Sequence, residues 1–165
     1  YLAFIDSDDV WLKDKMKKQI YFMEKNNYNF SHTNYYSFKD GNKKLKKIFT
    51  PSKINFHDFT KNTSIGTSTM IIKRSVAKNI KFTSTKICED YFYKCLLLKR
   101  INYSFRLNSF QTKYRIRKDS LQSNRLKNLF WIWKINNKYN NFNFVQNLLS
   151  VFFISINSLK KYGFK

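Results

Sequence analysis

The feature that most constrains this chain is a short apolar run that ends in a cluster of carboxylates. Residues 1–5 read YLAFI, and Asp6, Ser7, Asp8 and Asp9 follow at once. A run of this kind, rich in β-forming side chains, predicts a strand buried on both faces of a parallel sheet. Ligands of open α/β sheets bind at the carboxyl ends of the strands, so these acids are expected at a binding edge.

Strand and helix patterns alternate along the rest of the chain. We expect strands at 30–38, 101–107 and 109–117, a turn and strand at 64–72, and a surface hairpin at 39–47. Helices are expected at 11–25, 55–61 and 89–99, and residues 121–162 have helical periodicity. The alternation predicts an α/β fold. Because a central strand needs neighbours, we also expect that strands pairing with residues 1–5 come from a segment before Tyr1.

The three aspartates can be interpreted in two ways. Three carboxylates within four residues repel one another unless a cation or several donors neutralise them, and a hard divalent ion shared with substrate phosphates would do so. Alternatively, Asp8 or Asp9 caps the following helix, although one cap explains only one aspartate. A calcium loop of the EF-hand type is excluded, because Trp11 and Lys17 stand where that loop needs Gly and Glu.

A second acidic pair, Glu89 and Asp90, opens the helix expected at 89–99. Acids in the first turn complement the helix dipole. A carboxylate at such a position in a cleft could also act as a general base toward a hydroxyl nucleophile. The sequence alone leaves both interpretations open.

The chain is strongly basic, with 32 Lys and Arg against 10 Asp and Glu and a formal net charge of +22. Together with 19% aromatic residues, this charge suggests a nucleic-acid-binding module as the alternative function. The bases are scattered, however, and the aromatics follow strand and helix periods typical of core packing. We therefore expect no nucleic-acid partner.

Two further features bear on location. Cys88 and Cys95 are the only cysteines and are expected to be free thiols in a reducing cytoplasm, and no stretch of 18 apolar residues predicts a membrane span. The apolar segment 144–159, beside lysines, could rest on an anionic membrane surface at its cytoplasmic face. Packing of one helix face onto the domain is the interpretation we favour here, through Phe144, Leu148, Leu149, Phe152 and Ile156.

Taken in order, several segments resemble family 2 glycosyltransferases of the GT-A fold, in particular bacterial teichuronic acid biosynthesis glycosyltransferases. The resemblance is carried by YLAFIDSDDVWLKDKMKKQIYFM at 1–23, FSHTNYYSF at 30–38, NTSIGTSTMIIKRSV at 62–76, CEDYFYKCLLLK at 88–99 and TKYRIRKDSLQSN at 112–124. It implies a mixed sheet flanked by helices, with residues 1–120 as the later part of the catalytic domain and 121–165 as a helical extension. The family's earlier nucleotide-binding strands would be missing, and the chain alone would be a poorly active or inactive fragment.

The resemblance also implies a reaction and its residues. A sugar would pass, with inversion, from a nucleotide-diphosphate sugar such as a UDP-sugar to a hydroxyl of a cell-surface glycan or lipid-linked acceptor. Donor-binding residues would be Asp6, Ser7, Asp8 and Asp9, with Asp8 and Asp6 holding Mn²⁺ or Mg²⁺. Asp90 would be the catalytic base, and the sugar and acceptor pocket would include Gly66, Glu89 and Trp131. Arg115 and Arg117 would contact the departing diphosphate.

Overall fold

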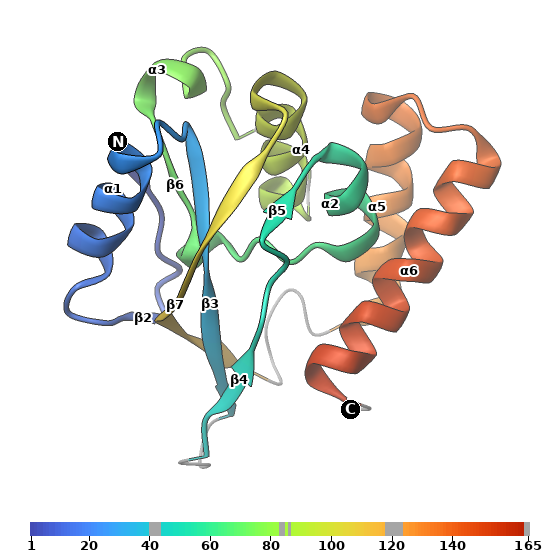
Figure 1. Ribbon diagram of the computed structural model, residues 1–165. Helices are drawn as coiled ribbons and strands as arrows, with labels where there is room; N and C mark the ends of the chain where they lie inside the picture. Colours follow the sequence, from blue (N-terminus) through green and yellow to red (C-terminus); the bar gives the residue numbers. More distant parts are fainter. Residues whose placement is uncertain (40–43, 83–84, 86, 118–123, 164–165) are drawn as a thin grey trace.

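A mixed β-sheet built around two long parallel strands forms the centre of the molecule (Figure 1). The structure is a computed structural model that describes residues 1–39, 44–82, 85, 87–117 and 124–163. Strand β3 (Phe30–Lys39) runs parallel to β7 (Ser104–Ile116), and every other pairing is antiparallel. The short strands are β1 (Leu2–Ala3), β2 (Val10–Trp11), β4 (Lys46–Ile48), β5 (Lys53–Ile54) and β6 (Ile71–Ile72). The sheet order is β1-β6-β3-β7-β2, with β4 paired to β3 and β5 to β7.

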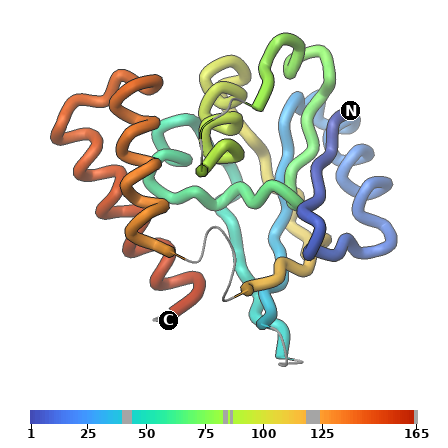
Figure 2. Tube along the Cα trace, turned by 180° about the vertical axis from the view of Figure 1, so that it is seen from behind, coloured from blue at the N-terminus to red at the C-terminus, as the bar shows by residue number. Residues whose placement is uncertain are grey.

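Helices flank this sheet on both sides, which confirms the expected α/β class. Helix α1 (Lys15–Lys25) lies on one side, and the other helices gather on the opposite side, as Figures 1 and 2 show from front and back. These are α2 (Phe56–Asn62), α4 (Glu89–Ile101), α5 (Arg125–Asn140) and α6 (Phe144–Tyr162). Two single turns, η1 (Thr67–Thr69) and α3 (Arg74–Ala77), complete the described elements.

The helix ends follow from local sequence. Asn55 and Asp58 form a capping box at the start of α2, and Asn143 and Gln146 form another at the start of α6. Between α5 and α6 the chain turns at Asn141, whose left-handed backbone (φ 57°) is one that asparagine tolerates better than most residues. The C-terminal helical pattern is therefore two antiparallel helices joined by a short turn.

The main core lies between the sheet and α4. Phe30 and Ile72 face it from the sheet, Phe59 from α2, and Leu97 and Leu98 from α4, all essentially inaccessible to solvent. Ile132, Ile135 and Ile154 of α5 and α6 belong to the same cluster. The two C-terminal helices therefore share a core with the preceding residues.

A buried polar network fastens the C-terminal helices to α2 and α4. The Tyr91 hydroxyl donates to Asn136 Oδ1 (2.7 Å), and Asn136 Nδ2 donates to Ser150 Oγ (3.0 Å). Ser150 Oγ donates in turn to the Thr60 carbonyl (2.6 Å), and Asn140 Nδ2 donates to Asn136 Oδ1 (2.9 Å). Buried polar groups that satisfy one another in this way fix the relative placement of the helices they join.

The opening run forms the expected strand, and within residues 1–165 it pairs on one side. Strand β1 is only partly buried and pairs antiparallel with β6, its sole partner among the described strands. Leu2 and Phe4 pack against the core, whereas Ile5 is half exposed. The apolar run therefore has one side packed on the core and one side more exposed.

Two expected element boundaries were wrong. Trp11 belongs to strand β2, where it pairs with Thr112 of β7, and its indole nitrogen donates to the Ser68 carbonyl (2.7 Å). Helix α1 begins only at Lys15. The strands expected at 101–107 and 109–117 are one strand, β7. Leu107 pairs with Thr33 and Phe110 with Asn34, so the break in the pattern is a bulge within continuous pairing.

The favoured interpretation of the 144–159 segment was wrong as well. Phe144, Leu148, Leu149 and Phe152 are exposed, and the buried residues of α6 are Asn147, Ser150 and Ile154. None of the helices in the described ranges combines the length and apolar character that crossing a bilayer requires. Cys88 and Cys95 are both buried and free, as expected.

The polar network predicts a specific loss of stability. Replacing Asn136 with leucine should lower the free energy of unfolding by about 2–3 kcal/mol, because the Tyr91 hydroxyl and the Ser150 hydroxyl lose a buried partner. Urea denaturation followed by circular dichroism measures this. Asn137→Leu, at the exposed neighbouring position of α5, is the matched control and should change stability by roughly 0.5 kcal/mol or less. Equal losses in both variants would contradict the proposed role of the network.

Candidate active site

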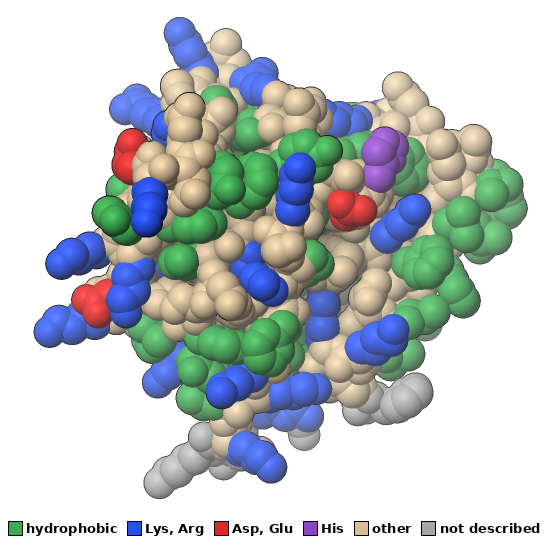
Figure 3. Space-filling model, in the orientation of Figure 1, with side chains coloured by type: hydrophobic (Ala, Val, Ile, Leu, Met, Phe, Trp, Pro, Cys, Tyr) green, Lys and Arg blue, Asp and Glu red, His purple; other side chains and the backbone are tan. Residues whose placement is uncertain are grey.

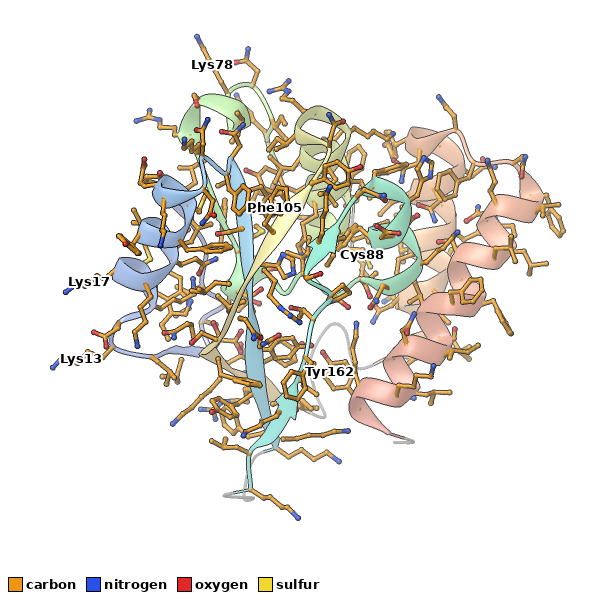
Figure 4. All side chains as sticks on the ribbon, in the orientation of Figure 1. Lys13, Lys17, Lys78, Cys88, Phe105 and Tyr162 are labelled. Carbon is orange, nitrogen blue, oxygen red and sulfur yellow. The ribbon has the colours of Figure 1, made fainter. Side chains whose placement is uncertain are left out.

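A cavity of about 780 Å³ opens between the sheet, the start of α4 and the C-terminal helices. Its wall comes from four places: the turn after β1, the segment around η1, the first turns of α4, and the end of β7. Helices α5 and α6 form the remaining side. Among its lining residues are seven of those expected in the site: Asp6, Asp8, Asp9, Gly66, Asp90, Arg115 and Arg117. Cys88 and Tyr162, labelled in Figure 4, also line it, from the start of α4 and the end of α6.

Asp90 is held at one side of the cavity by two donors. Its Oδ2 accepts from Lys94 Nζ (2.8 Å) and from Thr67 Oγ1 (3.2 Å). Lys94 is buried and also donates to the Ile65 carbonyl (3.0 Å). Burial alone would raise the pKa of the Asp90 carboxyl, but the Lys94 ammonium outweighs it and holds that pKa below its usual range. Asp90 is therefore an oriented, ionised carboxylate at neutral pH.

Asp9 has a different role from its two neighbours. It is buried, and its Oδ1 accepts from the Arg115 backbone N–H (2.9 Å), which ties the turn after β1 to β7. For Oδ2, no hydrogen-bond partner occurs among the described residues. Burial raises the pKa of Asp9 to about 6. The geometry thus makes Asp9 a structural anchor in the cavity wall.

Asp6 and Asp8 present acidic groups at the same edge. The Asp6 backbone N–H donates to Ser68 Oγ (3.0 Å), which fixes the turn over η1. Partial burial raises the pKa of Asp6; the Lys94 ammonium opposes this shift, and the nearby carboxylates of Asp90 and Asp8 add to it. Negative charge is therefore concentrated at this end of the cavity, where a bound cation would lower its energy.

The carboxylates of Asp6, Asp8 and Asp9, called here the acidic edge, suit a hard divalent cation that shares its ligands with substrate. In the described part of the chain, no three His, Cys, Asp or Glu side chains form a preassembled metal site. A hard cation such as Mg²⁺ or Mn²⁺ needs only one or two protein carboxylates when substrate phosphates and water supply the other ligands. The raised pKa of Asp6 and the unpaired Oδ2 of Asp9 are the observations of this structure that agree with such an ion.

Two arginines from the end of β7 lie beside these acids. Arg115 Nε donates to the Asp8 carbonyl (3.1 Å), and Arg117 Nη1 is 4.0 Å from Asp8 Oδ2. The parallel course of β7 next to β3, together with its contact to β2, brings these arginines to the turn after β1. Cationic groups and carboxylates therefore alternate along this edge.

Three of the expected site residues do not line the cavity. Glu89 is exposed on the first turn of α4, Ser7 is exposed on the turn after β1, and Trp131 packs against the core. Glu89 precedes Asp90 on the helix and is turned about 100° from it, toward solvent and away from the cavity. The expectations for Glu89 and Trp131 as pocket residues are not supported by this placement.

Sequence reasoning missed two residues that hold Asp90. Lys94 follows Asp90 by four residues on a helix, which is the spacing at which acidic and basic side chains meet. The ion pair between them could therefore have been predicted from the sequence. Thr67 comes from a segment 23 residues earlier, and no local pattern indicates its contact with Asp90. A long-range hydrogen bond of this kind is visible only in the fold.

Comparison with known proteins agrees with this arrangement. Residues 1–81 match the family model described as glycosyl transferase family 2. WfgD of Escherichia coli, named a UDP-Glc:α-D-GlcNAc-diphosphoundecaprenol β-1,3-glucosyltransferase, is 31% identical over 169 residues, which cover 99% of this chain and 64% of that protein. The glycosyltransferase TuaG of Bacillus subtilis, named for teichuronic acid biosynthesis, is 35% identical over 128 residues, 77% of this chain and 51% of that protein. The chain thus spans between half and two thirds of the length of these relatives.

Solved structures confirm the fold. Crystal structures of S. aureus TarS residues 1–349, in complex with UDP and with UDP-GlcNAc, superpose with TM-scores of 0.59 and 0.60 at 12% and 15% identity. They cover 96% of this chain and 46% and 48% of TarS. The α/β architecture is that of the GT-A fold, and the chain belongs to glycosyltransferase family 2.

Proposed function

We propose that this chain is the acceptor-side catalytic part of an inverting glycosyltransferase that moves a sugar from a UDP-sugar to a hydroxyl of a lipid-linked or cell-surface glycan. The observation that carries the proposal is that Asp8 and Asp90, 82 positions apart, line one cavity. The names of WfgD and TuaG and the UDP complexes of TarS support the donor and acceptor classes. Residues 1–120 would form the catalytic unit, with the C-terminal helices as an extension that closes the cavity.

Asp90 is the proposed base. An acceptor hydroxyl is a poor nucleophile until a carboxylate begins to take its proton, and Asp90 is ionised and oriented by Lys94 and Thr67. Attack at the anomeric carbon from the face opposite the leaving diphosphate gives inversion. Gly66 lies in the same wall, where the lack of a side chain leaves room for a sugar ring.

Asp8 and Asp6 are the proposed holders of Mn²⁺ or Mg²⁺, as an acidic D-x-D pair. Such an ion neutralises the negative charge that grows on the departing diphosphate. Arg115 and Arg117 would supply further positive charge at that edge. Asp9 would keep the turn in place through the Arg115 backbone and would not contact the donor. Free buried thiols agree with a cytoplasmic location, which we include in the proposal.

Removing the proposed base should abolish most of the activity. Asp90→Asn should lower kcat by about 10²- to 10⁴-fold, because general-base catalysis contributes that much. The assay monitors UDP release during transfer from UDP-glucose to a synthetic GlcNAc-diphospholipid, with the full-length protein that contains residues 1–165, since the chain alone is expected to be poorly active. Glu89→Gln, which removes the adjacent exposed acid, should leave kcat within roughly twofold. The reverse ranking of the two variants would overturn the assignment of Asp90.

The Asp90–Lys94 pair predicts a change in the pH profile. Replacing Lys94 with methionine removes the ammonium 2.8 Å from Asp90, so burial is opposed only by the hydrogen bonds from Thr67 and the Tyr91 backbone, and the Asp90 pKa rises. A base must be ionised to act, so the acidic limb of kcat/KM should move to higher pH. Lys99→Met, in the exposed last turn of the same helix, is the control and should leave the limb in place. An unmoved limb in Lys94→Met would contradict the pairing.

Donor binding should depend on the ion and on Asp8. Asp8→Asn should weaken binding of UDP in the presence of Mn²⁺ by about tenfold or more, since one carboxylate ligand is lost. Isothermal titration calorimetry measures this on the full-length protein that contains residues 1–165, because the nucleotide-binding strands are expected before Tyr1. Chelation with EDTA should weaken binding by the unmodified protein in the same way. Asp14→Asn, an exposed acid of the α1 region, should bind like the unmodified chain. Equal affinity with and without Mn²⁺ would exclude the metal site.

A further inference from the structure

Helix α6 has its polar side buried and its apolar side exposed. Asn147, Ser150 and Ile154 face inward, and the first two are tied by hydrogen bonds to the Trp133 carbonyl and to Asn136 and Thr60. Phe144, Val145, Leu148, Leu149, Phe152 and Phe153 are between 39% and 69% exposed. These six residues, called here the outer face of α6, recur at helical spacing along one side of the helix.

The outer face of α6 is an extended apolar surface. Figure 3 shows hydrophobic side chains following one another along the outer edge of the molecule, where α6 lies in Figure 1. Single exposed apolar residues need no explanation, but a continuous row of phenylalanine and leucine on one helix marks an interaction site. Turning α6 about its axis to bury these apolar side chains would break the hydrogen bonds of Asn147 and Ser150 on the inner side.

The charge around the outer face indicates what covers it. From Asn124 to Gly163 there is no Asp or Glu, and four exposed bases are present: Lys127, Lys134, Lys138 and Lys160; two further bases, Arg125 and Lys161, line the cavity on the inner side. At the C-terminal end of α6, Lys160 and Lys161 line a hollow of about 400 Å³ with Lys46 and Lys47 of β4. A second copy of the same surface would meet like charges, so the partner is expected to be anionic and apolar at once.

We propose that the outer face of α6 docks on the surface of an anionic lipid bilayer. Phenylalanine and leucine side chains would enter the boundary between headgroups and acyl chains, and the flanking lysines would contact lipid phosphates. The opposite side of the same helix, through Ser155, Ser158 and Tyr162, lines the cavity that holds Asp90. Docking would therefore hold the cavity beside the membrane. The proposal stands apart from sugar transfer, because it is tested without donor or acceptor.

Vesicle flotation tests the docking surface. The chain should bind vesicles of equal parts phosphatidylcholine and phosphatidylglycerol and bind pure phosphatidylcholine far less. Replacing Leu148 and Phe152 together with serine should lower the partition coefficient about tenfold or more. The control, Tyr21→Ser with Phe82→Ser, removes two side chains that are 65% and 42% exposed on other segments and should bind normally.

A second variant tests the proposal by fluorescence quenching, which does not rely on a loss of binding. With Leu148→Trp, brominated acyl chains should quench the added fluorescence, whereas a Tyr21→Trp control on α1 should show no added quenching. The proposal is overturned if anionic vesicles do not bind, if the control pair loses binding as strongly as the test pair, or if Leu148→Trp is not quenched. It is also overturned if sedimentation shows a dimer that the Leu148 and Phe152 substitutions dissociate, since a second copy would then cover the face.

Discussion

The parallel pairing of β3 with β7 is the constraint on which the rest of this molecule depends. Every other described strand attaches directly or through β6 to these two, and the helices cover the faces that the pair creates. The same pairing carries Arg115 to the turn after β1, where its backbone N–H anchors Asp9. The acidic edge and Asp90 of α4 face a common cavity because β6, through β3, holds η1 between them.

The sequence predicted the parts of this structure that depend on local patterns. Acids in the first turn and bases in the last turn of 89–99 predicted α4, and the helix expected at 55–61 corresponds to α2. The partners of a strand are a different matter, because a short apolar run fits a central strand or a one-sided edge equally well. The pairing of β1 with β6 is a contact that the run itself does not specify.

In the candidate site, too, local patterns were predictable from the sequence and long-range contacts were not. Asp6, Asp8 and Asp90 were identified from their residue types and positions at element ends, and all three line the cavity. The separation of roles between Asp9 and Asp8, or between Asp90 and Glu89, depends on which way each side chain points and on donors from distant segments. The sequence likewise could not predict that the polar side of α6 is buried and its apolar side exposed. Periodicity identifies an apolar face, but it does not show whether that face points toward the core.

Paramagnetic NMR with UDP and Mn²⁺ tests most directly whether the acidic edge and Asp90 serve one reaction. Bound Mn²⁺ broadens the signals of nearby nuclei, and Mg²⁺ in its place gives the unbroadened reference. The amide signals of Asp8, Thr67 and Asp90 should broaden together, and that of Lys17, on the far side of the molecule in Figure 4, should not. Broadening confined to residues outside this cavity, or around Asp8 but not Asp90, would contradict the shared site.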